Sequence, residues 1–132
     1  MPLEDPGDLG WENGFEALYW FAPPKKDGCK AGCANGKPSW VTVNTKINFT
    51  NRGEFQAQKK DFPPEFFAAE WYGKIAIKEG GEYEFSTRSD DGSRLSINGK
   101  KVVDNWGLHS MVTKTGTVAL NKGYHDIKME FF

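Results

Sequence analysis

Two adjacent aspartates, Asp90 and Asp91, stand in the segment RSDDGSRLSING between two stretches of alternating apolar and polar residues, EYEFSTRS and RLSI. This pattern predicts strand, turn and strand. An aspartate beside a glycine is common in turns, because its carboxylate can accept hydrogen bonds from nearby backbone N–H groups. Two carboxylates also offer hard oxygen ligands of the kind calcium prefers, although calcium takes about six to eight of them. The pair has two interpretations, a turn-shaping element or part of a metal site.

A second group of candidate residues lies in the segment DNWGLHS, residues 104–110. Asp104 and Asn105 offer oxygen atoms, Trp106 offers a flat apolar face that can stack on a sugar ring, and His109 offers a polar contact. In the alternative interpretation Trp106 packs under the edge of a sheet, which is the commoner fate of a tryptophan, while Asp104 and Asn105 close a turn.

The two cysteines, Cys29 and Cys33, lie in the segment GCKAGC. We interpret them as a local disulfide that holds a loop in a compartment outside the cytosol. A zinc site is the alternative, but it needs further ligands, and His109 and His125 lack the short spacing of a zinc finger. The sequon that begins at Asn48 is compatible with secretion.

No arrangement of residues in the sequence predicts catalysis. His109 and His125 have Ser110 and Asp126 as neighbours, but nothing resembles a nucleophile elbow. Glycoside hydrolysis needs two separated acids across a cleft, whereas the two aspartates are adjacent. There is no glycine-rich phosphate loop either, so we expect a protein that is not an enzyme.

The composition of the 132 residues limits the possible partners. Lys and Arg number 17 against 18 Asp and Glu, which gives a net charge of -1 and no basic surface that predicts nucleic-acid binding. No apolar run approaches the length of a membrane span, so we expect no membrane insertion. The first residues have neither the basic region nor the apolar core of a signal peptide.

The pattern along the chain predicts an all-β fold. Fifteen Gly, seven Pro, five Trp and ten Phe are typical of short strands, many turns and an aromatic core. We expect residues 1–13 to be a flexible lead-in and residues 14–132 to form a single domain, with a long loop at 22–39. The predicted strands are 14–21, 40–50, 69–77, 82–89, 94–97, 100–106, 117–120 and 125–132.

The alternation also assigns side chains to faces. Val41 and Val43 fall on one side of their strand together with Ile47 and Phe49. The predicted inner residues of the later strands are Trp71, Ile75, Ile77, Ile127, Met129 and Phe131. Asn98-Gly99 is the strongest short hairpin signal in the chain.

The order of motifs over residues 69–132 resembles the protective-antigen-type (PA-fourteen) domain family of yeast flocculins, bacterial adhesins and the anthrax toxin protective antigen. These motifs are EWYGKI, GEYEF, SDDGSRL, an Asn-Gly-Lys hairpin, VVDNW and LNKGYHDIKMEFF. The segment GFEALYWF is similar to the family's first strand, and the region between is less similar. The resemblance implies an antiparallel β-sandwich.

The resemblance also implies a metal site. In the adhesin branch two consecutive aspartates joined by a cis peptide bind calcium, which coordinates sugar hydroxyls directly; Asp90 and Asp91 match that pair. The adhesins complete the site with a second loop after the strand that corresponds to YHDIKMEFF, and this sequence ends at Phe132. We therefore expect a sandwich that lacks its last strand, or one that a partner segment completes, or a member that does not use this site.

The leading hypothesis is a lectin-like or adhesin-like module on the cell surface or outside the cell. It binds a glycan or polysaccharide through calcium held by Asp90 and Asp91, with Asn105, Trp106 and His109 lining the site. The alternative is a structural module that packs against other domains or chains of a larger assembly, in which the aspartate pair only shapes a turn.

Overall fold

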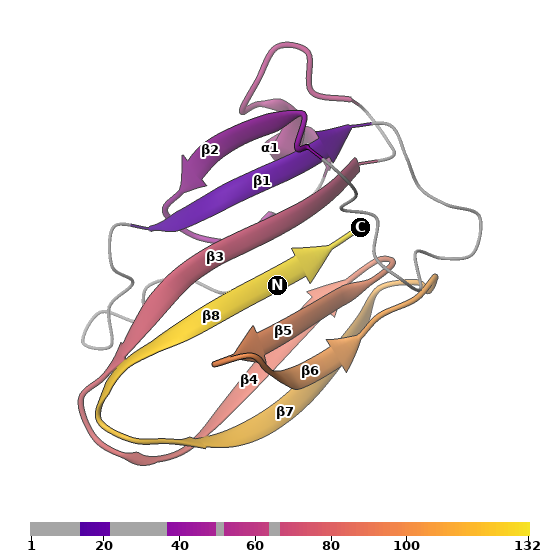
Figure 1. The fold of residues 1–132 in the computed structure, drawn as a ribbon. Helices are drawn as coiled ribbons and strands as arrows, with labels where there is room; N and C mark the ends of the chain where they lie inside the picture. Colours follow the sequence, from indigo (N-terminus) through magenta and orange to yellow (C-terminus); the bar gives the residue numbers. More distant parts are fainter. Residues whose placement is uncertain (1–13, 22–36, 50–51, 64–66) are drawn as a thin grey trace.

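The computed structural model describes residues 14–21, 37–49, 52–63 and 67–132, and its strands form two antiparallel sheets (Figure 1). The larger sheet has the order β2-β1-β3-β8-β5-β6, and the smaller one pairs β4 with β7. The elements are β1 (Phe15–Phe21), β2 (Trp40–Asn44), α1 (Arg52–Gln56), β3 (Phe67–Ile77), β4 (Gly81–Ser89), β5 (Ser93–Ile97), β6 (Lys100–Asn105), β7 (Val112–Leu120) and β8 (Gly123–Phe131). The predicted antiparallel sandwich is confirmed.

The chain changes sheets at two opposite ends of the sandwich. At one end the aspartate turn leads from β4 to β5, and residues 106–111 lead from β6 to β7. Phe132, which follows β8, lies at this same end, because its N–H donates to the carbonyl oxygen of Gly92 at 3.0 Å. At the other end lie the turn of the β5–β6 hairpin and the turn from β7 to β8. The two candidate segments are therefore neighbours in space.

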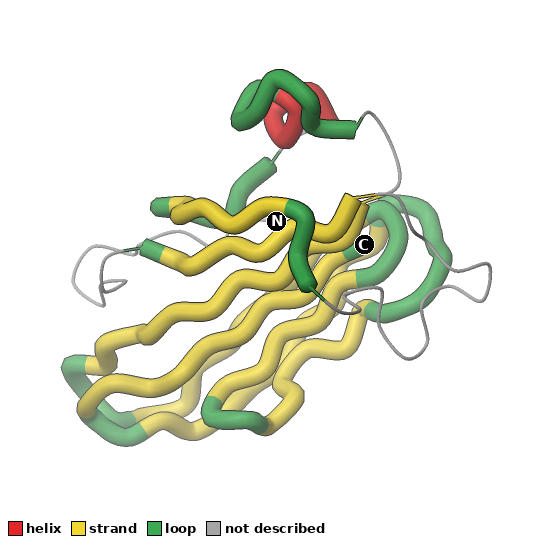
Figure 2. Tube along the Cα trace, turned by 45° about the horizontal axis from the view of Figure 1, so that its top comes forward, coloured by secondary structure: helices red, strands yellow, loops and turns green. Residues whose placement is uncertain are grey.

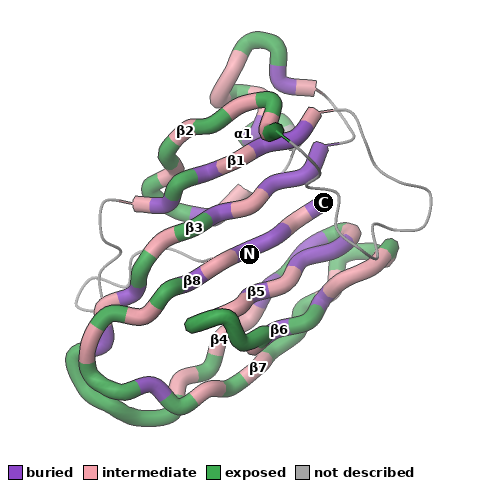
Figure 3. The backbone as a smooth tube through the Cα atoms, viewed as in Figure 1, coloured by how far each residue is buried: buried purple, intermediate pink, exposed green. Residues whose placement is uncertain are grey.

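The core lies between the two layers (Figures 2 and 3). Figure 1 shows β4 and β7 behind β8, β5 and β6, while α1 lies behind β1 and β2. Phe55 of α1 and Phe62 pack against Tyr19 of β1 with ring centroids 6.4 and 5.3 Å away. The aromatic side chains of residues 52–63 thus cover the inner face of β1.

A partly buried polar network joins three strands of the large sheet beside this aromatic cluster. The Asn44 side-chain oxygen accepts hydrogen bonds from the Tyr19 hydroxyl at 2.8 Å and from the Trp71 indole N–H at 2.9 Å. The Asn44 amide donates to Gln58 at 2.7 Å, so residues 52–63 are tied to the sheet as well. Burial raises the pKa of Tyr19 to about 12, so its hydroxyl remains a donor in alkaline solution as well as at neutral pH.

The predicted faces are confirmed for the later strands and wrong for β2. Trp71 and Ile75 of β3 and Met129 of β8 are buried, as the alternation predicted. Val41 and Val43, however, are 52% and 61% exposed. The β1–β2 register places Trp40 opposite the inward-facing Tyr19, so Trp40, Thr42 and Asn44 take the inner positions of β2.

Two predicted boundaries are also wrong. The strand β7 begins at Val112 rather than at 117. Its polar first half also pairs with β4, so the two strands are paired from Val112 to Leu120. Strand β2 ends at Asn44, and Ile47 is buried beyond it. Residues 1–13 and the cysteine loop with Cys29 and Cys33 lie outside the described residues, as does Thr50 of the sequon. Within the described ranges no helix is long and apolar enough to cross a membrane.

Candidate binding site at one end of the sandwich

The aspartate turn is a short, strained link between the two sheets. Asp91 adopts a positive φ of 66°, a left-handed conformation that aspartate tolerates better than most residues. The hydroxyl of Ser89 donates to the backbone carbonyl of Asp91 at 2.8 Å and stabilises the turn. No described peptide bond is cis, so Asp90 and Asp91 are joined by a trans bond, unlike the pair that the resemblance implied. The Asp90 side chain is exposed to solvent.

The loop 106–111 docks onto this turn through a reciprocal pair of hydrogen bonds. The backbone N–H of Asp91 donates to the carbonyl oxygen of His109 at 2.8 Å. In return the backbone N–H of His109 donates to the Asp91 carboxylate at 3.3 Å. The two segments named from the sequence, around Asp91 and His109, are therefore one structural unit.

His109 fixes the conformation of its own loop. Its ring nitrogens lie 2.7 Å from the carbonyl oxygen of Ser110 and 2.8 Å from that of Asn105. Both nitrogens can donate only when the ring is a protonated imidazolium. The hydrogen bond to the Asn105 carbonyl raises the pKa of His109, as do the bond to Ser110 and the charges of Asp91 and Asp90, while burial lowers it.

We predict that His109 titrates above its ordinary pKa of 6.5 in the folded protein. A raised folded-state pKa means that the imidazolium contacts contribute to stability fully below the unfolded-state value and lose this contribution as the pH rises through the folded-state value. A ¹H NMR pH titration of the His109 ring in chelator-treated buffer measures the shift. A midpoint at or below that of the urea-unfolded protein contradicts the two-carbonyl arrangement.

Asn105 lies beneath the loop rather than on its surface. It is 2% exposed, and its amide donates to the carbonyl oxygens of Val112 at 2.9 Å and Thr87 at 3.3 Å. The hydroxyls of Ser89 and Ser93 lie 2.6 Å apart in the same buried group, and that of Ser93 donates to Thr87. Among the described residues the Asn105 side-chain oxygen has no hydrogen-bond partner. Asn105 therefore connects β6 to β4 and β7, and the loop starts from a fixed point.

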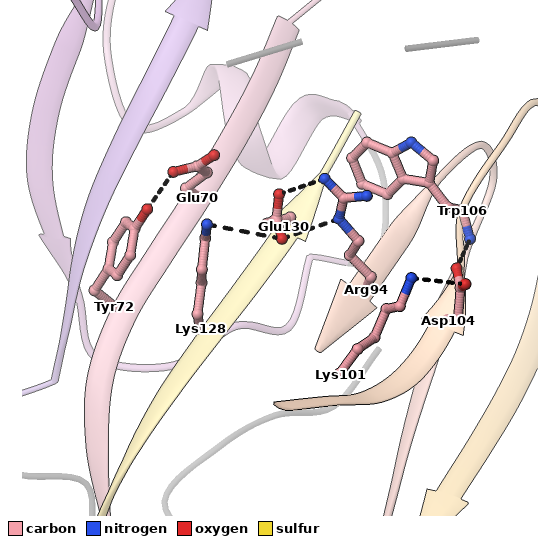
Figure 4. Close-up of polar contacts among 8 residues, drawn as sticks. All are labelled: Glu70, Tyr72, Arg94, Lys101, Asp104, Trp106, Lys128 and Glu130. Carbon is pink, nitrogen blue, oxygen red and sulfur yellow. Dashed lines mark hydrogen bonds and ion pairs between the residues drawn. The ribbon is translucent and has the colours of Figure 1, made fainter. Parts of the chain in front are cut away.

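Trp106 is partly enclosed by side chains of the large sheet (Figure 4). The Arg94 guanidinium lies over its ring at 3.9 Å from the centroid, a cation–π contact, and Phe132 approaches it with ring centroids 4.8 Å apart. Arg94 is itself held by a bidentate pair with Glu130, in which both N–O distances are 2.9 Å. The structure thus matches the packing interpretation of Trp106 more closely than that of an open stacking platform.

Asp104 closes the turn at the start of the loop. Its carboxylate accepts a hydrogen bond from the backbone N–H of Trp106 at 3.3 Å and forms an ion pair with Lys101 at 3.1 Å (Figure 4). The bond to Lys101 lowers the pKa of Asp104. This exposed carboxylate shapes the turn, as the alternative interpretation of the sequence proposed.

Sequence reasoning missed three features of this end. A Cβ at Gly92 would lie 2.1 Å from a ring carbon of Phe132. Position 92 therefore needs glycine, because the Phe132 ring packs against it. Leu108 and Met111 are exposed large apolar residues in the loop, on either side of His109. The glycine after the aspartates was visible in the sequence, whereas the exposure of Leu108 and Met111 depends on where the loop turns.

The site offers the type of ligand that calcium prefers, but only a small number of such ligands. The exposed Asp90 and the half-buried Asp91 supply carboxylate oxygens, which suit a hard cation. No group of three or more His, Cys, Asp or Glu side chains in the described part of the chain is arranged to hold a metal. A cation bound here therefore takes most of its ligands from backbone carbonyls, water or a bound molecule.

Comparison with known proteins identifies the family. The PA14 domain family matches residues 11–132. The chain belongs to this family. The resemblance inferred from the motif order is thereby confirmed.

Three relatives give this PA14 domain its context. The anti-sigma-I factor RsgI3 of Acetivibrio thermocellus is 33% identical over 67 residues, which is 50% of this chain and 10% of that protein. The PA14 domain of the MpAFP antifreeze protein aligns with a TM-score of 0.71 and 17% identity, over 97% of this chain and 79% of that one. The PA14 sugar-binding domain from an RTX adhesin aligns with a TM-score of 0.69 and 23% identity, over 90% and 81%.

Proposed function

We propose that this PA14 domain is a non-catalytic carbohydrate-binding module that binds its sugar through calcium held by Asp90 and Asp91. The observation that supports it is the aspartate turn, with Asp90 exposed and Asp91 half-buried, onto which the His109 loop is docked by two hydrogen bonds. A domain of the same fold in an RTX adhesin is described as sugar-binding, which favours the same class of ligand.

Calcium supplies a charge that binds neighbouring hydroxyl oxygens of a sugar, since it needs about six to eight oxygen ligands. Asp90 and Asp91 would hold the ion. The hydrogen bond from the His109 N–H orients the Asp91 carboxylate. Leu108 and Met111 present apolar surface beside the turn, which suits the C–H face of a sugar ring. Asn105 and Trp106 contribute by holding the loop, and a sugar meets only the part of the Trp106 ring that Arg94 and Phe132 leave accessible.

The double substitution Asp90→Asn with Asp91→Asn tests the calcium step. The parent protein should gain several degrees in Tm at millimolar calcium, because a ligand that binds only the folded state stabilises it. The double variant should gain nothing. The matched control exchanges two other exposed aspartates, Asp61→Asn with Asp126→Asn, and should respond as the parent does. If calcium does not change the Tm of the parent protein, a calcium site at Asp90 and Asp91 is excluded.

A glycan array probed with and without chelator tests the sugar step separately. The proposal predicts binding to at least one class of glycan, loss of that binding in chelator and loss in the double variant. Binding that persists in chelator supports carbohydrate binding and contradicts a role for calcium in it. An array without any binding in calcium contradicts the function itself.

A second candidate function is a structural module that contacts other proteins. The observation that favours it is the similarity to RsgI3, whose name describes an anti-sigma factor. The matched region makes up 10% of RsgI3. In this case the aspartate turn only connects the sheets, and neither calcium nor glycans change the Tm. For either function we propose a location outside the cell or on its surface, in agreement with the adhesin relative.

A further inference from the structure

The opposite end of the sandwich contains an asparagine whose side chain is bound at both of its polar atoms. Asn98 forms the turn of the β5–β6 hairpin with Gly99, at φ values of 52° and 80°. Its side-chain oxygen accepts a hydrogen bond from the backbone N–H of Asp126 at 3.0 Å, and its amide nitrogen lies 2.8 Å from Nδ1 of His125. Its own backbone N–H donates to the carbonyl oxygen of Asp126 at 2.8 Å. The turn is thus fastened to β8.

The donor and acceptor roles in this contact follow from the backbone. Because the Asp126 N–H can only donate, the Asn98 oxygen must face it, and the Asn98 amide nitrogen then faces His125. Nδ1 of His125 must accept from this amide. The other ring nitrogen, Nε2, lies 2.7 Å from the carbonyl oxygen of Asn121 and carries the proton. His125 therefore joins the β5–β6 turn to the turn between β7 and β8 through one hydrogen bond at each ring nitrogen.

An asparagine followed by glycine is chemically reactive. The backbone nitrogen of the glycine attacks the side-chain carbonyl carbon of the asparagine, the C–N bond of the amide breaks, and ammonia leaves. Water then opens the five-membered imide at either carbonyl and yields aspartate or isoaspartate. Gly99 has no side chain to hinder the attack, and both turn residues are exposed. The attack requires the Asn98 side chain to turn toward Gly99, which breaks its bonds to Asp126 and His125.

We propose that Asn98 is a deamidation site whose rate is set by release of the β5–β6 turn from β8, with His125 as the side chain that restrains it. The reaction product lacks the hydrogen bond from position 98 to His125 that holds the turn in the unmodified protein. Aspartate at position 98 has no N–H to donate to Nδ1 of His125, and isoaspartate adds a backbone carbon to a two-residue turn. Either product loosens the hairpin irreversibly, so this modification is a slow, one-way weakening of the sheet at the end remote from Asp90 and Asp91.

Mass spectrometry of the incubated full chain measures the rate directly. The protein is held in mildly alkaline buffer and digested with trypsin, and the peptide Leu95–Lys100, bounded by Arg94 and Lys100, reports replacement of the amide nitrogen by oxygen. Two other Asn-Gly pairs, Asn13-Gly14 and Asn35-Gly36, fall in separate tryptic peptides and monitor the solution conditions. The native chain should react at least about tenfold more slowly at Asn98 than the same chain unfolded in urea, since the turn must first open.

Substitutions at His125 identify the restraint. His125→Ala should accelerate reaction at Asn98 about fivefold, the effect of losing one hydrogen bond of ordinary strength. His125→Gln, which keeps an acceptor, should react more slowly than His125→Ala. His109→Ala at the other end is the matched control and should react at the parent rate. Equal rates in the folded His125→Ala variant and the parent contradict the role of His125, and equal rates in native and unfolded parent contradict the proposal even if His125→Ala does not fold.

Discussion

Replacing Trp71 with alanine is expected to lower the free energy of unfolding by about 3–5 kcal/mol, the usual cost of removing a large aromatic side chain from a core. Trp71 is 1% exposed at the centre of β3, and it packs against Tyr19 and Phe49 with ring centroids 6.1 and 6.2 Å away. Its indole N–H also donates to Asn44 at 2.9 Å. The loss is a large fraction of the stability of a domain, which is about 5–15 kcal/mol.

Urea unfolding followed by circular dichroism measures this loss, and two further variants locate its origin. Trp71→Phe keeps much of the ring volume and removes the N–H, so it should cost less than Trp71→Ala. Tyr124→Ala removes an aromatic side chain that is 67% exposed and should change stability little. If Trp71→Ala is no more destabilising than Tyr124→Ala, the packing around β3 is not as described.

The position of Trp71 in the core was predictable because β3 contributes one inner face with a clear period of two. The contacts that fix its N–H were not. Asn44 receives the Trp71 and Tyr19 hydrogen bonds across a sequence separation of 27 and 25 residues. A polar residue in a strand predicts an outer face, and here the network turned Asn44 inward and left Val41 and Val43 outside.

The candidate site shows the same division between local and distant signals. The turn at Asp90 and Asp91 was predictable from the alternation on either side of it, and the hypothesis that His109 lines the same site placed the two segments together, as their hydrogen bonds do. The environment of Trp106 does not, because it depends on Arg94, 12 positions earlier in the sequence, and on Phe132, 26 positions later. Whether an aromatic ring is open to a ligand is thus decided by tertiary contacts that alternation cannot describe.

The second large effect is expected at Gly116, where β7 passes close to the backbone of β6 in the other sheet. A Cβ at this position would lie 1.9 Å from the carbonyl oxygen of Val102 and 2.8 Å from its carbonyl carbon. Both atoms belong to the backbone of β6, so no change of side-chain rotamer can relieve the overlap. Gly116→Ala should therefore push β7 away from β6 and reduce the free energy of unfolding by about 3 kcal/mol, the upper range for overpacking.

Gly81 provides the matched control for this substitution. It lies in the neighbouring strand β4, and a Cβ built on it meets nothing within 4 Å. Alanine has less conformational freedom than glycine in the unfolded chain, so Gly81→Ala should leave stability unchanged or raise it by about 0.5–1 kcal/mol. The two variants carry the same chemical change in paired strands of one sheet. Opposite shifts in the urea midpoint identify the β6–β7 contact as the cause, and equal shifts contradict it, since only Gly116 has the Val102 backbone above it.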